Sequence, residues 1–294
     1  MRRALELFRE AIEIDPEYAL AYVGVADVYN AFGFYAVEAP RDTFPKARAA
    51  ALRALEIEPS LAEAKVALGY VAHYHDWAFV ETERIYREAI AAAPEYPTGH
   101  LFLANLLASL GRFDEALASV RRGLETDPLS LILHASLGFA PYFAGRPEEA
   151  AAGYAKTLEL DPAFLPARFY LGCSLLALGR AREAVDELER AVAISGGDTW
   201  TRTALAGALA AAGRRSDAEA LLEELASGTA YVPSFDVAAA RAALGQTDAA
   251  FEALERALAE RSHWMTFVRF EPRLASLRGD PRFASVVARV GFPA

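Results

Sequence analysis

The chain has 294 residues, of which 54% are hydrophobic and 24% are charged. This composition excludes an intrinsically disordered chain and predicts a folded protein. The net charge of −10 at pH 7 argues against nucleic acid as a partner, because phosphate binding needs a basic surface.

The single cysteine, Cys173, excludes an internal disulfide and fits a reducing compartment. No stretch approaches about 18 uncharged apolar residues, and charged residues interrupt the N-terminal MRRALELFREAIEIDP. We therefore expect a cytoplasmic protein with no membrane partner. Alanine makes up about a fifth of the chain, which favours closely packed helices because alanine is small and the best helix former.

Turn-like segments recur along the chain. They are LGRFDEAL from Leu110, AGRPEEAA from Ala144, LGRAREAV from Leu178, AGRRSDAE from Ala212 and LGQTDAAF from Leu244. Their glycines are 34, 34, 34 and 32 residues apart. Prolines mark the ends of earlier units at Pro16, Pro59, Pro94, Pro128 and Pro162. Glycine permits the left-handed backbone that ends one helix, and Asp-Pro suits the start of the next.

A period of 34 residues with these markers resembles the tetratricopeptide repeat (TPR), which is a pair of antiparallel helices. In residues 131–164 the family's anchors match Leu137-Gly138, Gly145, Ala150 and Pro162. The resemblance covers residues 1–264. It implies an all-α fold, an α-solenoid in which about seven helix pairs form a right-handed superhelix, with roughly 75–80% helix.

The same register divides the chain. Residues 1–18 form a partial repeat, the second helix of a pair, and residues 265–294 form a C-terminal capping segment over the end of the array. Residues 19–264 form the array, whose units are 19–61, 62–96, 97–130, 131–164, 165–198, 199–230 and 231–264.

Three features depart from the regular pattern. The first unit is longer than the others, and we expect a long inter-helix excursion after Gly33. The second has one extra residue near Trp77. No first helix precedes residues 1–18, so we expect a truncated array in which Leu5, Phe8 and Ile12 lack a partner, and an open end that permits self-association.

More narrowly, the chain resembles the TPR tail of bacterial multidomain regulators, in which such arrays follow a winged-helix, nucleotide-cyclase or protein-kinase domain. The segments that carry this resemblance are YHDWAFVETERIYREAI from Tyr74, GRFDEALASVRRGLETDPLSL from Gly111 and DPRF from Asp280. No motif of those effector domains is present, so none of their activities is implied.

Catalytic and metal-binding motifs are also absent from the sequence. His73 and His75 are two residues apart, so on a regular helix they point in opposite directions and cannot share a metal. Cys173 has one basic neighbour on its helix, Arg168, and we expect it to pack rather than react. We therefore predict no catalytic residue, no cofactor, no metal and no enzymatic activity.

The concave surface of a TPR array is lined by the second, fifth, ninth and twelfth positions of each first helix, which share one helix face. In this register the predicted partner-binding groove consists of Tyr70, His73, Leu101, Asn105, Phe139, Tyr142, Phe169, Cys173 and Trp200. This face is aromatic and nearly uncharged, and predicts an apolar or aromatic peptide or protein segment as partner. Alternatively, some rings pack between helices or against the chain's own cap, which leaves less open surface.

The C-terminal segment is rich in arginine. Either Arg273 and Arg282 cap helices and pair with neighbouring acids, or the arginines dock an acidic partner. For the whole chain we favour a non-enzymatic protein-interaction scaffold, the interaction or regulatory part of a larger bacterial protein. The alternative is a substrate-orienting subunit or tail of an enzyme, a cyclase, kinase or transferase, whose catalytic domain is not part of this chain.

Overall fold

The computed structural model describes residues 1–293, and 78% of the chain is helical with no strand in the described part. Seven antiparallel helix pairs follow one another. Their first helices are α2 (Ala19–Phe34), α4 (Ala62–Val71), α6 (Pro97–Ser109), α8 (Leu131–Phe143), α10 (Leu165–Ala177), α12 (Thr199–Ala211) and α14 (Ser234–Ala243). Their second helices are α3 (Pro40–Ile57), α5 (Phe79–Ala92), α7 (Phe113–Thr126), α9 (Pro147–Leu160), α11 (Ala181–Ser195), α13 (Arg215–Ser227) and α15 (Thr247–Ala259). The predicted all-α solenoid is therefore confirmed.

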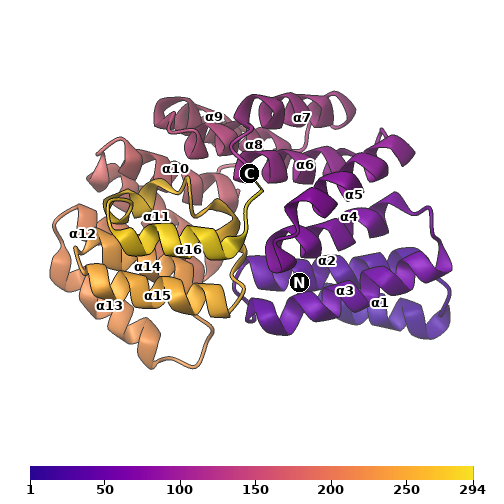
Figure 1. Cartoon of the computed structure of the whole chain (residues 1–294), viewed down its shortest axis with the longest axis horizontal. Helices are drawn as coiled ribbons and strands as arrows, with labels where there is room; N and C mark the ends of the chain where they lie inside the picture. The colour runs from indigo at the N-terminus through magenta and orange to yellow at the C-terminus, as the bar shows by residue number, and fades with distance from the viewer. Residues whose placement is uncertain (294) are drawn as a thin grey trace.

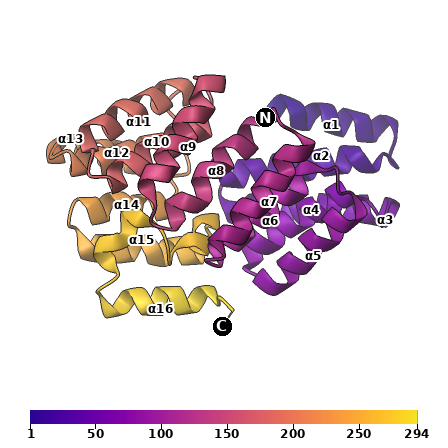
Figure 2. The same cartoon turned by 90° about the horizontal axis from the view of Figure 1, so that it is seen from above.

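The pairs are arranged along an arc that brings the first pair back beside the last ones (Figures 1 and 2). The closing contacts come from the end of α2. The Phe34 ring lies 4.7 Å from the ring of His263, and the Tyr35 ring lies 5.8 Å from that of Trp200 on α12. The end of α2 therefore contacts both the segment after α15 and the start of α12.

Glycine permits both the tight turns and the close helix crossings. The turn glycines at the recurring positions, such as Gly145, have φ near +70 to +80°, which other residues adopt at a cost. Gly138 on α8 has a different role: a Cβ there would lie 2.9 Å from the backbone oxygen of Ala150 and 2.9 Å from the Tyr154 ring. Any larger residue would push α8 and α9 apart.

The first unit differs from the expectation of a long excursion after Gly33. The loop covers residues 35–39, and most of the extra residues lengthen the helices instead, since α2 has 16 residues and α3 has 18. Pro40 at the start of α3 explains the early restart, because its fixed φ suits the first helical turn. The extra residue of the second unit forms a π-helical turn, η1 (Ala72–Asp76), which ends at Trp77 with φ +59°.

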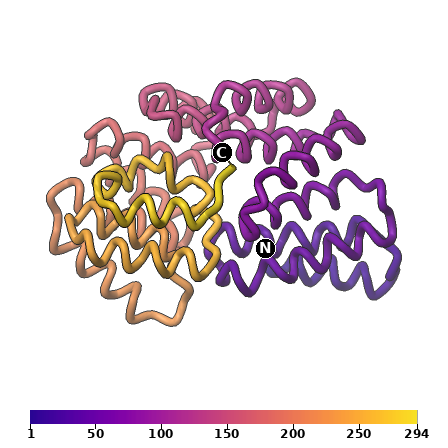
Figure 3. The backbone as a smooth tube through the Cα atoms, in the orientation of Figure 1, coloured from indigo at the N-terminus to yellow at the C-terminus, as the bar shows by residue number. Residues whose placement is uncertain are grey.

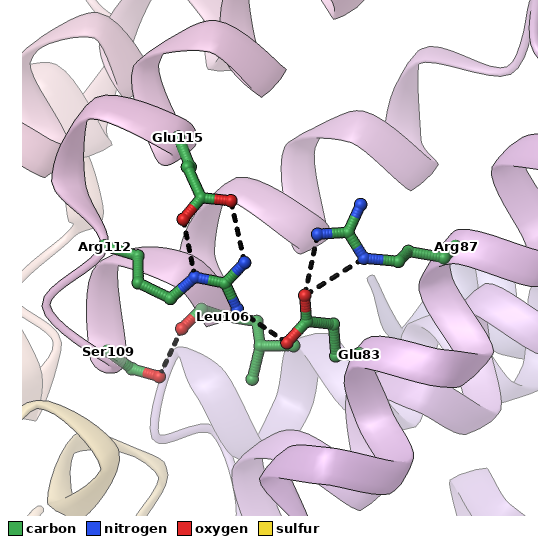
Figure 4. A network of polar contacts seen from close by, with 6 residues as sticks. All are labelled: Glu83, Arg87, Leu106, Ser109, Arg112 and Glu115. Atoms are coloured by element: carbon green, nitrogen blue, oxygen red, sulfur yellow. Dashed lines mark hydrogen bonds and ion pairs between the residues drawn. The ribbon is translucent and has the colours of Figure 1, made fainter.

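A surface ion network links the second and third pairs (Figure 4). Glu83 on α5 accepts hydrogen bonds from Arg87 and, at 2.7 Å, from Arg112 in the turn before α7. Arg112 also donates to Glu115, at 2.7 Å. In the same region the Ser109 hydroxyl, in the last turn of α6, donates to the backbone oxygen of Leu106.

The expected unpartnered face of the N-terminal helix α1 (Arg2–Ile14) is covered. Leu5 is buried, Phe8 and Ile12 are partly buried, and the Phe8 ring packs directly over Gly24 on α2. The expectation failed because the following helix α2, rather than a preceding one, supplies the partner surface. The large apolar side chains of α1 that face solvent are Leu7 and Ile14.

The chain beyond α15 also departs from the predicted cap. Helix α16 (Pro281–Val290) packs on α15, but two 3₁₀ helices before it, η2 (His263–Phe267) and η3 (Pro272–Leu277), do not cover the end of the array. They turn back along its concave side, and the tube in Figure 3 then follows the chain to its end near the centre of the arc. Their aromatic and charged side chains are complementary to that surface, as described below.

Gly138→Val tests the close crossing of α8 and α9. We expect overpacking to lower the free energy of unfolding by about 2 kcal/mol, and the melting temperature by roughly 5 °C. Gly279→Val is the matched control, because nothing lies within 4 Å of a Cβ at that position. Equal melting temperatures for the two variants would contradict the proposed role of Gly138.

Candidate functional site

Residues 263–278, which we call the concave segment, fill one part of the concave surface with aromatic side chains. Trp264 and Phe267 are buried. The Phe267 ring stacks on Phe143 at 4.5 Å and meets Phe139 edge-on at 5.2 Å. Because these rings leave water together, their burial stabilises the fold as a whole, and the segment behaves as part of the core.

A buried ion network holds the second half of the concave segment. Arg273 donates to Glu271 at 2.9 Å and to Asp236 on α14 at 2.7 Å, and the Tyr142 hydroxyl donates to Glu271 at 2.6 Å. Burial alone would raise the pKa of Glu271, but the charge and hydrogen bonds of Arg273 outweigh it and lower that pKa. Burial raises the pKa of Asp236 despite the same arginine. The network therefore compensates charges that would otherwise be costly to bury.

Two similar segments, EPRL from Glu271 and DPRF from Asp280, make the same local contacts in different surroundings. In each, the acid caps the helix start and pairs with the arginine two residues later: Glu271 with Arg273, and Asp280 with Arg282. The first pair is buried and the second is half exposed. Local pairing, rather than an open basic patch, accounts for these arginines, and Arg289 likewise pairs with Glu255.

Most of the nine predicted groove residues are buried. Buried residues are Tyr70, His73, Leu101, Tyr142, Phe169, Cys173 and Trp200, and partly buried ones are Asn105 and Phe139. The concave segment contacts Tyr142 through Glu271, and Phe169 through the Arg273 guanidinium at 5.8 Å. The expectation of a groove open along its length is therefore corrected, because the chain's own segment occupies part of it.

What remains open is an aromatic cavity of about 310 Å³. Five predicted groove residues line it: Tyr70, Leu101, Asn105, Phe139 and Trp200. Along α8 the cavity is lined by residues from Ile132 to Phe139, whereas the concave segment contacts Phe139, Tyr142 and Phe143 nearer the end of that helix. On α2 the cavity is lined by residues from Asp27 to Phe34, in the second half of the helix. The concave side is thus divided into a filled strip and a cavity.

The cavity also holds polar groups from α2 that the groove prediction did not include. Asp27 lines it, is accessible to solvent, and forms no hydrogen bond or ion pair within residues 1–293. Desolvation of this carboxyl by the surrounding cavity wall raises its pKa to about 7. Asn30, one turn further, donates to the backbone oxygen of Ala67 at 3.3 Å, while its Oδ1 is buried with no partner in the described residues. The Asp27 carboxylate therefore faces an aromatic space, with the Asn30 amide buried in the wall.

Sequence comparison identifies the repeats. Models described as tetratricopeptide repeat match residues 78–137, 141–199 and 175–230, which together cover about half of the chain. The chain belongs to the tetratricopeptide-repeat family. No curated protein is significantly similar to the chain.

Solved structures agree on the TPR fold. A thermophilic TPR protein of Thermus thermophilus, TTC0263, superposes with a TM-score of 0.54 at 22% identity over 58% of this chain and 92% of that one. A TPR protein of Parabacteroides merdae gives 0.55 at 14% identity over 92% and 98%. The human IFIT1 dimer with PPP-AAAA gives 0.59 at 18% identity over 88% and 68%. At these identities the likeness shows the fold alone.

The TPR register explains why Asp27 and Asn30 were missed. Counted from Ala19, they occupy the ninth and twelfth positions of the first unit, the same positions as Tyr70 and His73 in the second. The predicted groove began with the second unit and so did not include them. Phe34 and Tyr35, which also line the cavity, lie beyond the register, and no sequence signal placed them there.

Cys173 and His73, whose side chains could act in catalysis, are both buried. Burial raises the pKa of Cys173 to about 12, which disfavours a thiolate. The Ser109 hydroxyl donates to Leu106, so His73 Nε2 donates to Ser109 at 3.1 Å, and burial lowers the pKa of His73 to about 3. Among the described residues no group of three His, Cys, Asp or Glu could hold a metal ion. Within residues 1–293 no helix is long and apolar enough to cross a membrane.

Arg273→Leu and Arg282→Leu compare the two arginines. Loss of Arg273 leaves Glu271 and Asp236 buried without a cation, and we expect a cost of about 3–5 kcal/mol. Loss of Arg282 removes a half-exposed pair and costs about 0–1 kcal/mol. Urea unfolding measures the cost, and limited proteolysis with mass spectrometry shows whether residues 263–278 become cleavable. Equal losses in the two variants would contradict the anchoring role of the buried network.

His263→Phe tests the acid sensitivity of the concave segment. Both ring nitrogens of His263 are buried without a partner in the described residues, and burial lowers its pKa to about 3. Its neutral form therefore contributes stability above about pH 6.5, and this contribution is lost as the pH falls towards 3. At pH 5 the loss is about 2 kcal/mol, which His263→Phe should abolish. Melting temperatures at pH 7 and pH 5 measure it, and an unchanged pH dependence would contradict the assignment.

Proposed function

We propose that this TPR chain is a non-catalytic protein-interaction module that anchors a partner segment in the aromatic cavity. A TPR fold in general supports a protein-interaction scaffold, and the cavity lies on the concave side of this one. The observation that carries the proposal is the exposed part of its wall, where Ile132 is 39% accessible and Asn105 and Phe139 are half-buried. A volume of about 310 Å³ accommodates a large side chain.

The concave segment supports an aromatic or apolar partner. It shows which side chains this surface accepts, since Phe267 reaches from the filled strip to Phe139 on the cavity wall. The half-buried amide of Asn105 lies on the same wall beside Tyr74, where it is positioned to hold a partner's backbone. A partner segment in the cavity would thus add aromatic contacts of the kind that Phe267 already makes with Phe139.

The proposal also covers the larger protein to which the chain would belong and its place in the cell. The chain acts as the interaction or regulatory part of a larger bacterial protein in the cytoplasm, in keeping with its resemblance to the TPR tails of multidomain regulators. The buried state of Cys173 and His73 supports a binding role over catalysis. Self-association through α1 receives no support from Leu5 and Phe8, which pack against α2.

The test is a capture experiment with an Asn105→Ala/Phe139→Ala variant. Partners are cross-linked to the intact chain, identified by mass spectrometry and purified, and their affinity is then measured directly. Because aromatic anchors typically contribute 2 kcal/mol or more, we expect at least about thirtyfold weaker binding with an unchanged circular dichroism spectrum.

The matched control is Leu129→Ala in the loop before α8, where the side chain is 85% exposed and does not line the cavity. It should bind like the parent. If the cavity variant also binds like the parent, partners dock elsewhere and the proposal is wrong. Should the double variant unfold, Asn105→Ala alone removes the polar contact without creating a large void.

A further inference from the structure

The aromatic cavity contains a carboxylate that nothing in the described chain neutralises. Asp27 lies midway along α2, and no lysine or arginine is among the residues that line the cavity. Two acids near the C-terminus, by contrast, share one cation: Asp280 pairs with Arg282 at 2.8 Å and Asp248 with the same arginine at 2.9 Å. An ionised group partly removed from water among rings is costly unless a cation accompanies it.

The cavity wall suits a cation for a second reason. Tyr70, Tyr96 and Trp200 line it, and the faces of such rings attract positive charge at distances up to about 6 Å. Burial raises the pKa of Tyr70 well above its usual value and that of Tyr96 to about 12, so both phenols stay neutral at ordinary pH. Neutral rings around one carboxylate form the combination that recognises alkylammonium groups.

Asp27 is the acidic residue of the cavity wall that is open to solvent. Its side chain is exposed, whereas the polar side chains of Asn30 and Trp200 on the same wall are buried. The carboxylate of Asp27 is therefore the negatively charged group that a molecule entering the cavity can reach.

We propose that the cavity binds an organic cation, an alkylammonium group on an apolar or aromatic body, with Asp27 as its counter-ion. The inference rests on the proposed function, because it names the chemical group that the cavity would select in a partner. The same chemistry occurs in a lysine side chain of a partner segment and in a free amine, and the experiment separates these two sources.

The first experiment compares phenethylamine with 2-phenylethanol. The two probes have similar size and shape, but the amine is a cation at pH 8. Isothermal titration calorimetry and the fluorescence of the tryptophans report binding to the full chain. We expect the amine to bind at least about tenfold more tightly than the alcohol. Equal affinities would overturn the proposal.

Asp27→Asn removes the charge and keeps the shape. We expect it to abolish the preference for the amine and to leave the affinity for the alcohol unchanged. The matched control is Asp248→Asn on α15, which neutralises a carboxylate that is 87% exposed and outside the cavity, and which should bind like the parent. An amine preference that survives Asp27→Asn would overturn the role of Asp27.

The pH dependence gives an independent readout. The other titratable groups of the cavity wall are six tyrosines, and the carboxylate of Glu63 acts on one of them, Tyr96. The tyrosines are Tyr35, Tyr70, Tyr74, Tyr96, Tyr154 and Tyr170. Since desolvation raises the pKa of Asp27 to about 7, protonation below that pH removes the counter-ion. Amine affinity should fall about tenfold between pH 8 and pH 5.5 in the parent and remain constant in Asp27→Asn. A flat profile in the parent would count against the proposal.

A last pair of probes separates the sources of the cation. An apolar peptide with a central lysine is compared with the same peptide carrying norleucine. Preference for the lysine peptide supports both the cation site and a partner segment. If the amine binds and neither peptide does, the cation site stands and the proposed function fails. If both peptides bind equally and Asp27→Asn has no effect, the proposed function stands and the cation site fails.

Discussion

The buried ion pair between Arg273 and Glu271 is the interaction on which the arrangement of the concave side depends. It is completed by Tyr142 and Asp236, which come from α8 and α14. Helices from opposite parts of the arc are therefore joined through one short segment of chain. Removing either charge would leave the other buried and uncompensated, so the segment stays where the complete network can form.

This anchoring divides the concave side. TPR arrays usually offer their partners an extended concave surface, but here Trp264, Phe267 and the network fill one part of it. A cavity of about 310 Å³ remains beside the filled part. A long peptide groove is thus replaced by a compact site, whose size suits one large side chain or one small molecule.

Closure of the arc determines the chemistry of that site. Phe34 and Tyr35, at the end of the elongated α2, reach the concave segment and α12, and they bring Asp27 and Asn30 of the same helix to the cavity wall. An open arc would leave Asp27 more fully hydrated. In the closed one it lies among rings, which accounts for its raised pKa and for its proposed affinity for a cation.

The repeating pattern of glycines, small residues and prolines was sufficient to predict the helix pairs, because each unit is specified by local turn and packing chemistry. The register also predicted that Tyr70, Asn105 and Phe139 share one side. It could not predict the concave segment, since EPRL and DPRF look alike in sequence while one lies in the core and the other near the surface. That difference arises from contacts between residues more than a hundred positions apart, such as Tyr142 and Glu271. Local patterns carry no information about such pairings, so only the folded chain decides which part of the concave side is filled and which stays open.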